Sequence, residues 1–165
     1  MYRSICFAVA VLLFGTQVVL ATTFAIPEKN PVATITIPDS WEPETYDDGV
    51  EATSKDGDVY IAVESVESSE IGEVTREGLN WFKKKGVKID LASKTVAETS
   101  LDGMQVLTMS FKAQDKDGET EVAVSLIKLL AKNRFLLFYV WGSKEAGETN
   151  GAALGKIFNS LSPTK

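Results

Sequence analysis

The feature that most constrains the fold is a series of short segments in which apolar and polar residues alternate. In the segment 104–113, Leu107, Met109 and Phe111 are separated by single polar residues, and a period of two is typical of a strand with one buried face. Asp-Gly turn signals separate such segments, which indicates hairpins and an antiparallel sheet. Strands are predicted at 33–37, 50–54, 59–64, 95–101, 104–113, 119–131 and 135–141, and a further short strand is left open at 87–91.

The segment 135–141 differs from the others because it is apolar at both alternating sets of positions. A strand of this kind has both of its faces covered. We therefore expect it at the centre of the sheet, with a helix on each side.

Two helices are predicted. The first runs from 68 or 69 to about 85, with a serine N-cap, lysines in its last turn and Gly86 as the C-cap glycine. The second covers 149–161, where apolar residues recur at helical spacing. The sequence thus predicts an α+β fold, with a central antiparallel sheet of about six to seven strands flanked by two main helices.

The first 21 residues have the pattern of a secretory signal peptide. Arg3 supplies a positive start, 5–14 is an uninterrupted apolar run, and the small residues that precede cleavage end at Ala21. The apolar run is too short to span a bilayer by itself. We expect cleavage near Ala21 and a secreted protein, with no stable membrane span in the mature chain.

The rest of the chain is long enough for one domain. Residues 22–31 contain two prolines and little periodicity, and they are interpreted as an extended lead-in. Residues 32–165 are expected to form a single domain.

The residue types that are missing exclude several classes of function. The sequence has no histidine, and its single cysteine, Cys6, lies in the expected signal peptide. Catalysis by Ser-His-Asp or Cys-His groups is therefore excluded, as are disulfides and thiolate metal sites in the mature chain. A net charge of −6 argues against nucleic acid as a partner. No motif indicates a cofactor, a resident metal or a catalytic residue.

The densest acidic segment is 42–48, which begins at Glu42 and ends at Asp48. Its four carboxylates could hold a hard cation such as calcium, or act as an acid and base pair. The alternative is a solvated turn, which the lack of matching ligands elsewhere favours. Cation binding by this loop is left open.

Aromatic residues beside that loop are the candidate partner-binding residues. Trp41 follows Pro-Asp-Ser and precedes the acidic segment, which contains Tyr46. Trp41 could be an aromatic anchor at a protein interface, or it could fold back over the edge of the sheet. Trp81 and Trp141 fall at positions expected to be in the core.

The order of these signals resembles a known family. A strand ends in Pro-Asp-Ser-Trp at 38–41, a Lys-Asp-Gly turn stands at 55–57, and Asp-Gly at 102–103 opens the long strands. The last helix closes with Ile-Phe-Asn-Ser-Leu-Ser-Pro at 157–163. This pattern, which covers nearly all of the mature chain, resembles the PsbP/DcrB-like superfamily.

The resemblance implies an α-β-α sandwich and binding of another protein without catalysis. Members of the superfamily include an extrinsic subunit of photosystem II, an import factor that binds the GTPase Ran, bacterial envelope proteins and chaperones for secreted effectors. The family has no catalytic motif to transfer. The photosystem subunit binds ions partly through histidine, which this chain lacks.

These observations favour a secreted or periplasmic, non-enzymatic protein that serves another envelope protein as adaptor, stabiliser or chaperone. The bacterial periplasm is the expected location. Two alternatives stay open, a hydrolase that uses carboxylates alone and a carrier of a small ligand. The carrier would hold its ligand between sheet and helix, beside Phe135, Phe138 and Tyr139.

Overall fold

The structure is a computed structural model that describes residues 20–129 and 134–164. Its helices are α1 (Ile71–Lys84) and α2 (Lys144–Asn159), with short 3-10 helices at Asp39–Trp41 and Leu91–Ser93. Its strands are β1 (Ala21–Ile26), β2 (Ala33–Pro38), β3 (Glu44–Tyr46), β4 (Gly49–Thr53), β5 (Val59–Glu67), β6 (Lys88–Ile89), β7 (Thr95–Leu101), β8 (Met104–Asp115), β9 (Gly118–Lys128), β10 (Arg134–Gly142) and β11 (Ser162–Pro163).

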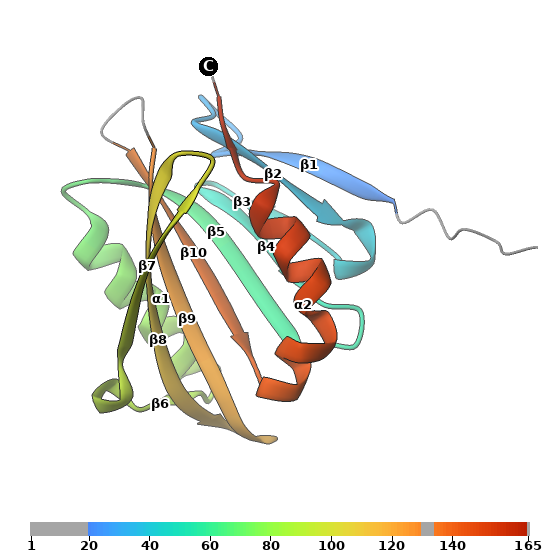
Figure 1. The fold of residues 1–165 in the computed structure, drawn as a ribbon, viewed down its shortest axis with the longest axis vertical. Coiled ribbons are helices and arrows are strands. Elements are labelled where there is room, and N and C mark those ends of the chain that lie inside the picture. The colour runs from blue at the N-terminus through green and yellow to red at the C-terminus, as the bar shows by residue number, and fades with distance from the viewer. Residues whose placement is uncertain (1–19, 130–133, 165) are drawn as a thin grey trace, which may run out of the picture.

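The strands form two antiparallel sheets (Figure 1). The main sheet has eight strands, in the order β3-β4-β5-β10-β9-β8-β6, and β7 also pairs with β8. A smaller sheet has the order β1-β2-β11. The predicted antiparallel sheet with two main helices is confirmed, although the sheet is larger than the six to seven strands expected. The shortest strands, β6 and β11, have two residues each and are too short to show alternation.

The predicted central strand is confirmed. β10 lies between β5 and β9, and Phe138 is paired with Val63 on one side and Ser125 on the other. Successive side chains of a strand point to opposite faces. The apolar residues at both sets of positions in β10 therefore enter two separate cores.

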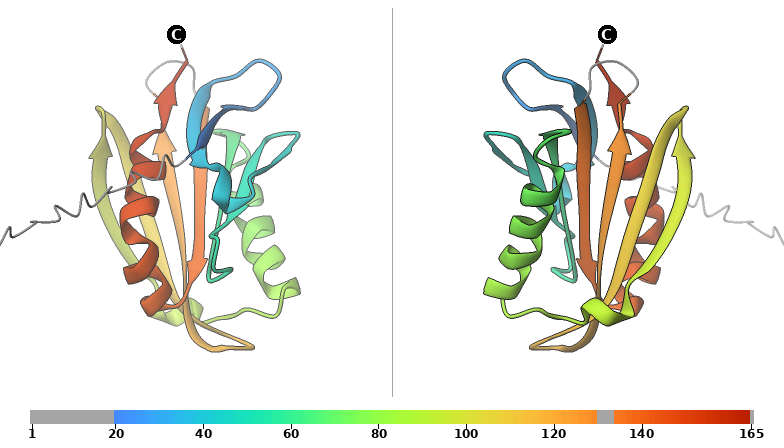
Figure 2. Two further views of the ribbon diagram at one scale, coloured as in Figure 1. Left: turned by 90° about the vertical axis from the view of Figure 1, so that its right-hand side faces the viewer. Right: turned by 90° about the vertical axis from the view of Figure 1, so that its left-hand side faces the viewer.

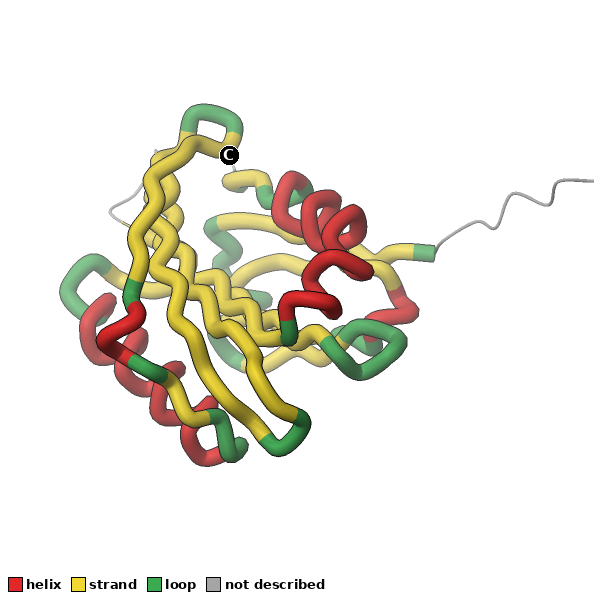
Figure 3. The backbone as a smooth tube through the Cα atoms, turned by 60° about the horizontal axis from the view of Figure 1, so that its bottom comes forward, coloured by secondary structure: helices red, strands yellow, loops and turns green. Residues whose placement is uncertain are grey.

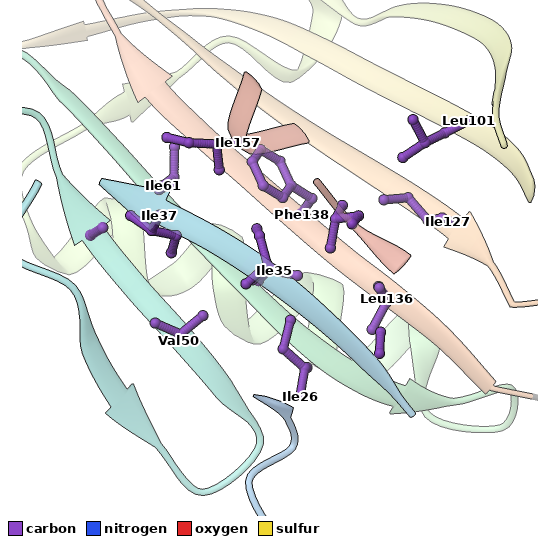
Figure 4. Close-up of a cluster of buried hydrophobic side chains, with 14 of the residues drawn as sticks. Ile26, Ile35, Ile37, Val50, Ile61, Leu101, Ile127, Leu136, Phe138 and Ile157 are labelled. Carbon is purple, nitrogen blue, oxygen red and sulfur yellow. The ribbon is translucent and has the colours of Figure 1, made fainter. Parts of the chain in front are cut away.

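One core lies between the main sheet, the smaller sheet and α2. Figure 4 shows Ile35 and Ile37 of β2 facing Ile61, Leu136 and Phe138 of the main sheet. Ile157 brings α2 into the same cluster.

The second core lies under α1. Leu137 and Tyr139 of β10 pack with Phe82 of α1 and with Val122 and Val124 of β9. The tube in Figure 3 shows the two helices on opposite sides of the strands, in agreement with the two clusters.

The helix ends differ in part from the prediction. Gly86 has a φ of 91°, as expected of the glycine that ends α1. The predicted serine N-cap is wrong, because Glu70 occupies that position and no side chain caps the helix. α2 begins at Lys144, earlier than predicted, and Ser143 caps it by accepting a hydrogen bond from the Ala146 amide. Its first turns have no apolar periodicity, so the sequence signal starts late.

The predicted signal peptide, residues 1–21, lies outside the described residues apart from its last two positions. Within the expected lead-in, β1 pairs with β2 along its whole length, and Ile26 is fully buried. Neither described helix has the length and apolarity that crossing a membrane requires.

Candidate functional site

The structure separates the two predicted partner-binding residues. Trp41 is only 4% exposed and belongs to the core cluster that contains β2. Of the two arrangements considered for Trp41, the structure shows the one that is folded inward. Tyr46 is 36% exposed and lies on β3, the edge strand of the main sheet. Only Tyr46 presents substantial surface to a partner.

The acidic segment 42–48 is made of β3 and the flanking turns. Glu42, Glu44, Asp47 and Asp48 are all exposed. Among the described residues, no group of three or more acidic, histidine or cysteine side chains is arranged to hold a metal ion. The carboxylates of this loop are therefore spread over the surface.

The strongest candidate site is a pocket of about 360 Å³ between α1 and the adjoining face of the main sheet, and we call it the α1 pocket. Figure 2 shows α1 beside the hairpin of β3 and β4. The volume is at the lower end of the range for ligand sites. The pocket is lined by Tyr46, Glu51, Tyr60, Ala62, Glu64, Val74, Glu77, Gly78, Trp81, Phe82 and Tyr139.

Aromatic rings form one wall of the α1 pocket. Tyr60 stacks on Trp81 with ring centroids 4.8 Å apart, and Phe82 meets Trp81 edge to face at 5.2 Å. Tyr60 comes from β5, whereas Trp81 and Phe82 are consecutive residues of α1. The wall thus forms only when α1 packs on the sheet.

Carboxylates from three elements also line the pocket. Glu51 of β4 accepts a hydrogen bond of 2.5 Å from the Tyr60 hydroxyl. Glu64 of β5 is partly buried, and this burial raises the pKa of its carboxyl, while the nearby Tyr139 hydroxyl lowers it. Glu77 is exposed on α1. Negative charge is therefore held partly out of water, where it interacts more strongly with a ligand.

The three tyrosines of the pocket are neutral hydrogen-bonding groups. Burial, together with the neighbouring carboxylates, raises the pKa of Tyr46, Tyr60 and Tyr139 well above the ordinary value of 10.0. Their hydroxyls keep their protons at physiological pH and can donate hydrogen bonds.

Two glycines of the pocket region allow close approach of their neighbours. A Cβ on Gly78 of α1 would lie 2.6 Å from the Tyr139 ring, and one on Gly49 would overlap the Val63 carbonyl oxygen of β5 and lie 2.8 Å from the Tyr46 hydroxyl. Glycine in the middle of a helix costs about 1 kcal/mol relative to alanine. At Gly78 the close approach of Tyr139 explains why that cost is present.

The residues predicted to hold a small ligand are only partly brought together. Tyr139 lines the α1 pocket. Phe138 points to the opposite face and packs against Phe158 of α2 at 5.4 Å, because neighbouring residues of a strand face opposite ways. Phe135 packs on the α1 side but does not line the pocket.

Sequence reasoning missed Glu51, Glu64 and Tyr60. Tyr60 and Glu64 alternate with the buried Val59, Ile61 and Val63, which in a sequence is the pattern of a strand with one solvated face. A helix covers that face in the structure. The signal that could have identified Glu64 is its place on a face that the α1 helix was expected to cover.

Comparisons with solved structures identify the fold. The solution structure of cyanobacterial PsbP (CyanoP) from Synechocystis sp. PCC 6803 is similar with a TM-score of 0.58 and 10% identity, over 93% of this chain and 98% of that one. LpqN of Mycobacterium tuberculosis is similar with a TM-score of 0.55 and 11% identity, over 88% and 92% of the two chains. Mog1p of Saccharomyces cerevisiae is similar with a TM-score of 0.50 and 11% identity, over 88% and 96%.

These likenesses confirm the PsbP-like fold that the resemblance of the sequence implied. No protein-family model and no curated protein matches the sequence. At 10 to 11% identity, the structural likeness is a statement about the fold and assigns no activity.

Proposed function

We propose that this chain, folded as an α-β-α sandwich after removal of residues 1–21, is a non-enzymatic domain of the bacterial periplasm that binds another envelope protein. The observation that carries the proposal is the α1 pocket, which extends over the face of the main sheet to its edge strand β3, where the exposed Tyr46 is one of the lining residues. An aromatic residue beside a concave, partly apolar surface is typical of the centre of a protein interface.

The named roles of two similar structures support this proposal. LpqN is described as involved in cell envelope biogenesis, and Mog1p as a Ran-binding protein. Both share only the fold with this chain, so they support a binding role and identify no partner.

The two aromatic residues beside the acidic loop take different parts in the proposal. Tyr46 contacts the partner directly. Trp41 is buried in the core at the end of the short 3-10 helix that precedes β3, and it anchors the segment that carries Tyr46.

Site-specific photo-crosslinking tests the proposal. A photoreactive phenylalanine analogue replaces Tyr46 in one variant and Glu98, which is exposed on β7, in a matched control. Both are expressed in the native envelope, and crosslinked proteins are identified by mass spectrometry. We expect one abundant product from position 46 that is absent from position 98. The same products from both positions, or none from position 46, would contradict the proposal.

A second candidate function is hydrolysis by carboxylates alone. Glu51 and Glu64 line the same pocket, and burial raises the pKa of Glu64, as in an acid catalyst. The tight hydrogen bond from Tyr60 to Glu51 argues against a free nucleophile. Hydrolysis of nitrophenyl glycosides by the wild type and not by Glu64→Gln would favour this candidate.

A further inference from the structure

We infer that the α1 pocket receives the positively charged side chain of a lysine or arginine on the partner protein. This inference rests on the proposed protein-binding function and adds the chemistry of recognition. Three properties of the pocket carry it: its aromatic wall, its carboxylates, and its apolar floor.

The aromatic wall is suited to a cation. Ammonium and guanidinium groups are attracted to the faces of aromatic rings, and most strongly to tryptophan. Lys85 of the chain itself places its ammonium nitrogen 5.0 Å from the centroid of the Trp81 ring, so this ring already attracts a cation in the fold. Tyr60, which stacks on Trp81, adds one further electron-rich ring to the same wall.

The carboxylates of the pocket have no positive partner within the described part of the chain. Its ion pairs join other residues, namely Arg76–Glu73, Lys116–Asp117, Arg134–Glu67 and Lys144–Glu148. None of these ion pairs includes Glu51, Glu64 or Glu77. Lys85 lines a neighbouring cavity together with Glu51, so the unpaired negative charge of the α1 pocket rests mainly on Glu64 and Glu77. A partly buried carboxylate in this state gains from a cation that enters the pocket.

The floor of the pocket matches the stem of such a side chain. Ala62 and Val74 contribute apolar surface to the lining of the pocket beside the carboxylates and the aromatic wall. Lysine and arginine pack their methylene groups on apolar surface and direct the charged end to a polar one. A metal ion would make no favourable contact with this apolar surface. A lysine or arginine side chain is complementary to the apolar surface through its methylene groups and to the carboxylates through its charged end.

The test uses the mature protein and four short peptides, Ac-Ala-Ala-X-Ala-Ala-NH2, with lysine, arginine, Nε-acetyl-lysine or glutamate at X. Binding is followed by NMR chemical shifts up to about 20 mM peptide, since a single side chain is expected to bind with a Kd of about 1 mM. The protein variants are Glu64→Gln and, as the matched control, Glu98→Gln on β7.

The expected result is that the lysine and arginine peptides shift resonances of α1, β4 and β5. The acetyl-lysine and glutamate peptides leave them unchanged. The affinity of the lysine peptide falls about tenfold in Glu64→Gln, the usual effect of losing one interaction with a charged group, and is unchanged in Glu98→Gln. Thermal melting of each variant shows whether it is folded.

Three results would overturn the inference. Equal binding of the lysine and acetyl-lysine peptides would show that charge is not recognised. No binding of either cationic peptide would show that the pocket does not take this side chain. At least tenfold tighter binding of free n-butylammonium than of the lysine peptide would assign the site to a small amine.

The inference and the proposed function fail in different ways. A crosslinked partner at position 46 without binding of cationic peptides contradicts the inference and leaves the binding function intact. Absence of a crosslinked partner contradicts the function itself, whatever the peptides do.

Discussion

Glu64 is a carboxylate that the fold keeps partly buried without a positive partner among the described residues. Because burial raises the pKa of Glu64 above its ordinary value of 4.5, the folded state binds more protons than the unfolded state over the interval between the two pKa values. The free energy of unfolding therefore falls as the pH rises through that interval. At pH values above the pKa of Glu64 in the folded protein, this contribution to the free energy of unfolding is fully lost.

This linkage predicts that Glu64→Gln melts at a higher temperature than the wild type at pH 7.5. The difference shrinks as the pH falls and disappears below about pH 4, where the carboxyl is protonated in both states. The difference in melting temperature is measured by thermal unfolding, followed by circular dichroism, at a series of pH values between 7.5 and 4. Glu98→Gln, on exposed β7, is expected to match the wild type throughout. A pH-independent difference for Glu64→Gln would contradict the assignment of a buried charge.

Substitution of Trp41 is expected to affect mainly the stability of the protein, whereas substitution of Tyr46 is expected to affect mainly peptide binding. Trp41→Ala removes a side chain that is 4% exposed, so it should cost about 3–5 kcal/mol of unfolding free energy. Tyr46→Ala, at the sheet edge, should cost only ~1 kcal/mol but weaken the binding of the lysine peptide, because Tyr46 lines the α1 pocket. Urea denaturation and NMR titration measure the two effects. A mild effect of Trp41→Ala would mean that its position in the core is wrong.

At the scale of the element, α1 is shaped by the tyrosine beneath it. Gly78→Ala gains helix propensity but places a Cβ 2.6 Å from the Tyr139 ring, and overpacking typically costs about 1–3 kcal/mol. We expect a net loss of stability and a shift of Tyr139 in the α1 pocket. The measurement is the urea concentration at the midpoint of unfolding. The slope of the unfolding free energy against urea should be the same in both proteins, so that a shifted midpoint reports a change in stability.

The same helix offers a matched control. A Cβ on Gly72, in the first turn of α1, would meet no atom within 4 Å, so Gly72→Ala should stabilise the protein by at most about 0.5–1 kcal/mol, the difference between the two residues inside a helix. Opposite signs for the two substitutions are the expected result. Stabilisation by both would show that α1 does not contact Tyr139 closely.

At the scale of the whole molecule, β1 belongs to the core although its sequence lacks a clear strand pattern. A variant that begins at residue 22 keeps most of β1, whereas one that begins at residue 32, the predicted domain start, lacks it. The shorter variant loses the fully buried Ile26 and exposes the edge of β2. We expect it to lose at least 2–5 kcal/mol and to aggregate through the free edge.

Thermal melting and light scattering of the two variants test this prediction. The variant that begins at residue 22 is expected to be monodisperse and stable. Equal melting temperatures would instead place the domain start at residue 32.

Much of the fold could be predicted because it depends on local patterns. Alternation in β8 and β9, apolar residues at both sets of positions in β10, and Gly86 at the end of α1 each follow from the chemistry of neighbouring residues. β6 lies within 87–91, where the sequence leaves a short strand open. β3, β11 and the six-residue β1 are not predicted, because they lack a clear alternation, and no local pattern decides between the two positions considered for Trp41.

The amino-acid sequence by itself determined the antiparallel sheet, its central strand and the two helices, because periodicity is a property of residues close in the chain. Only the tertiary structure decided the α1 pocket. Glu51, Tyr60, Glu64 and Trp81 come from β4, β5 and α1, and a helix that covers one face of a sheet brings them together. Which polar face of a strand is covered depends on packing between distant segments, and this is why Glu64 looked like a solvated residue in the sequence and is a pocket residue in the fold.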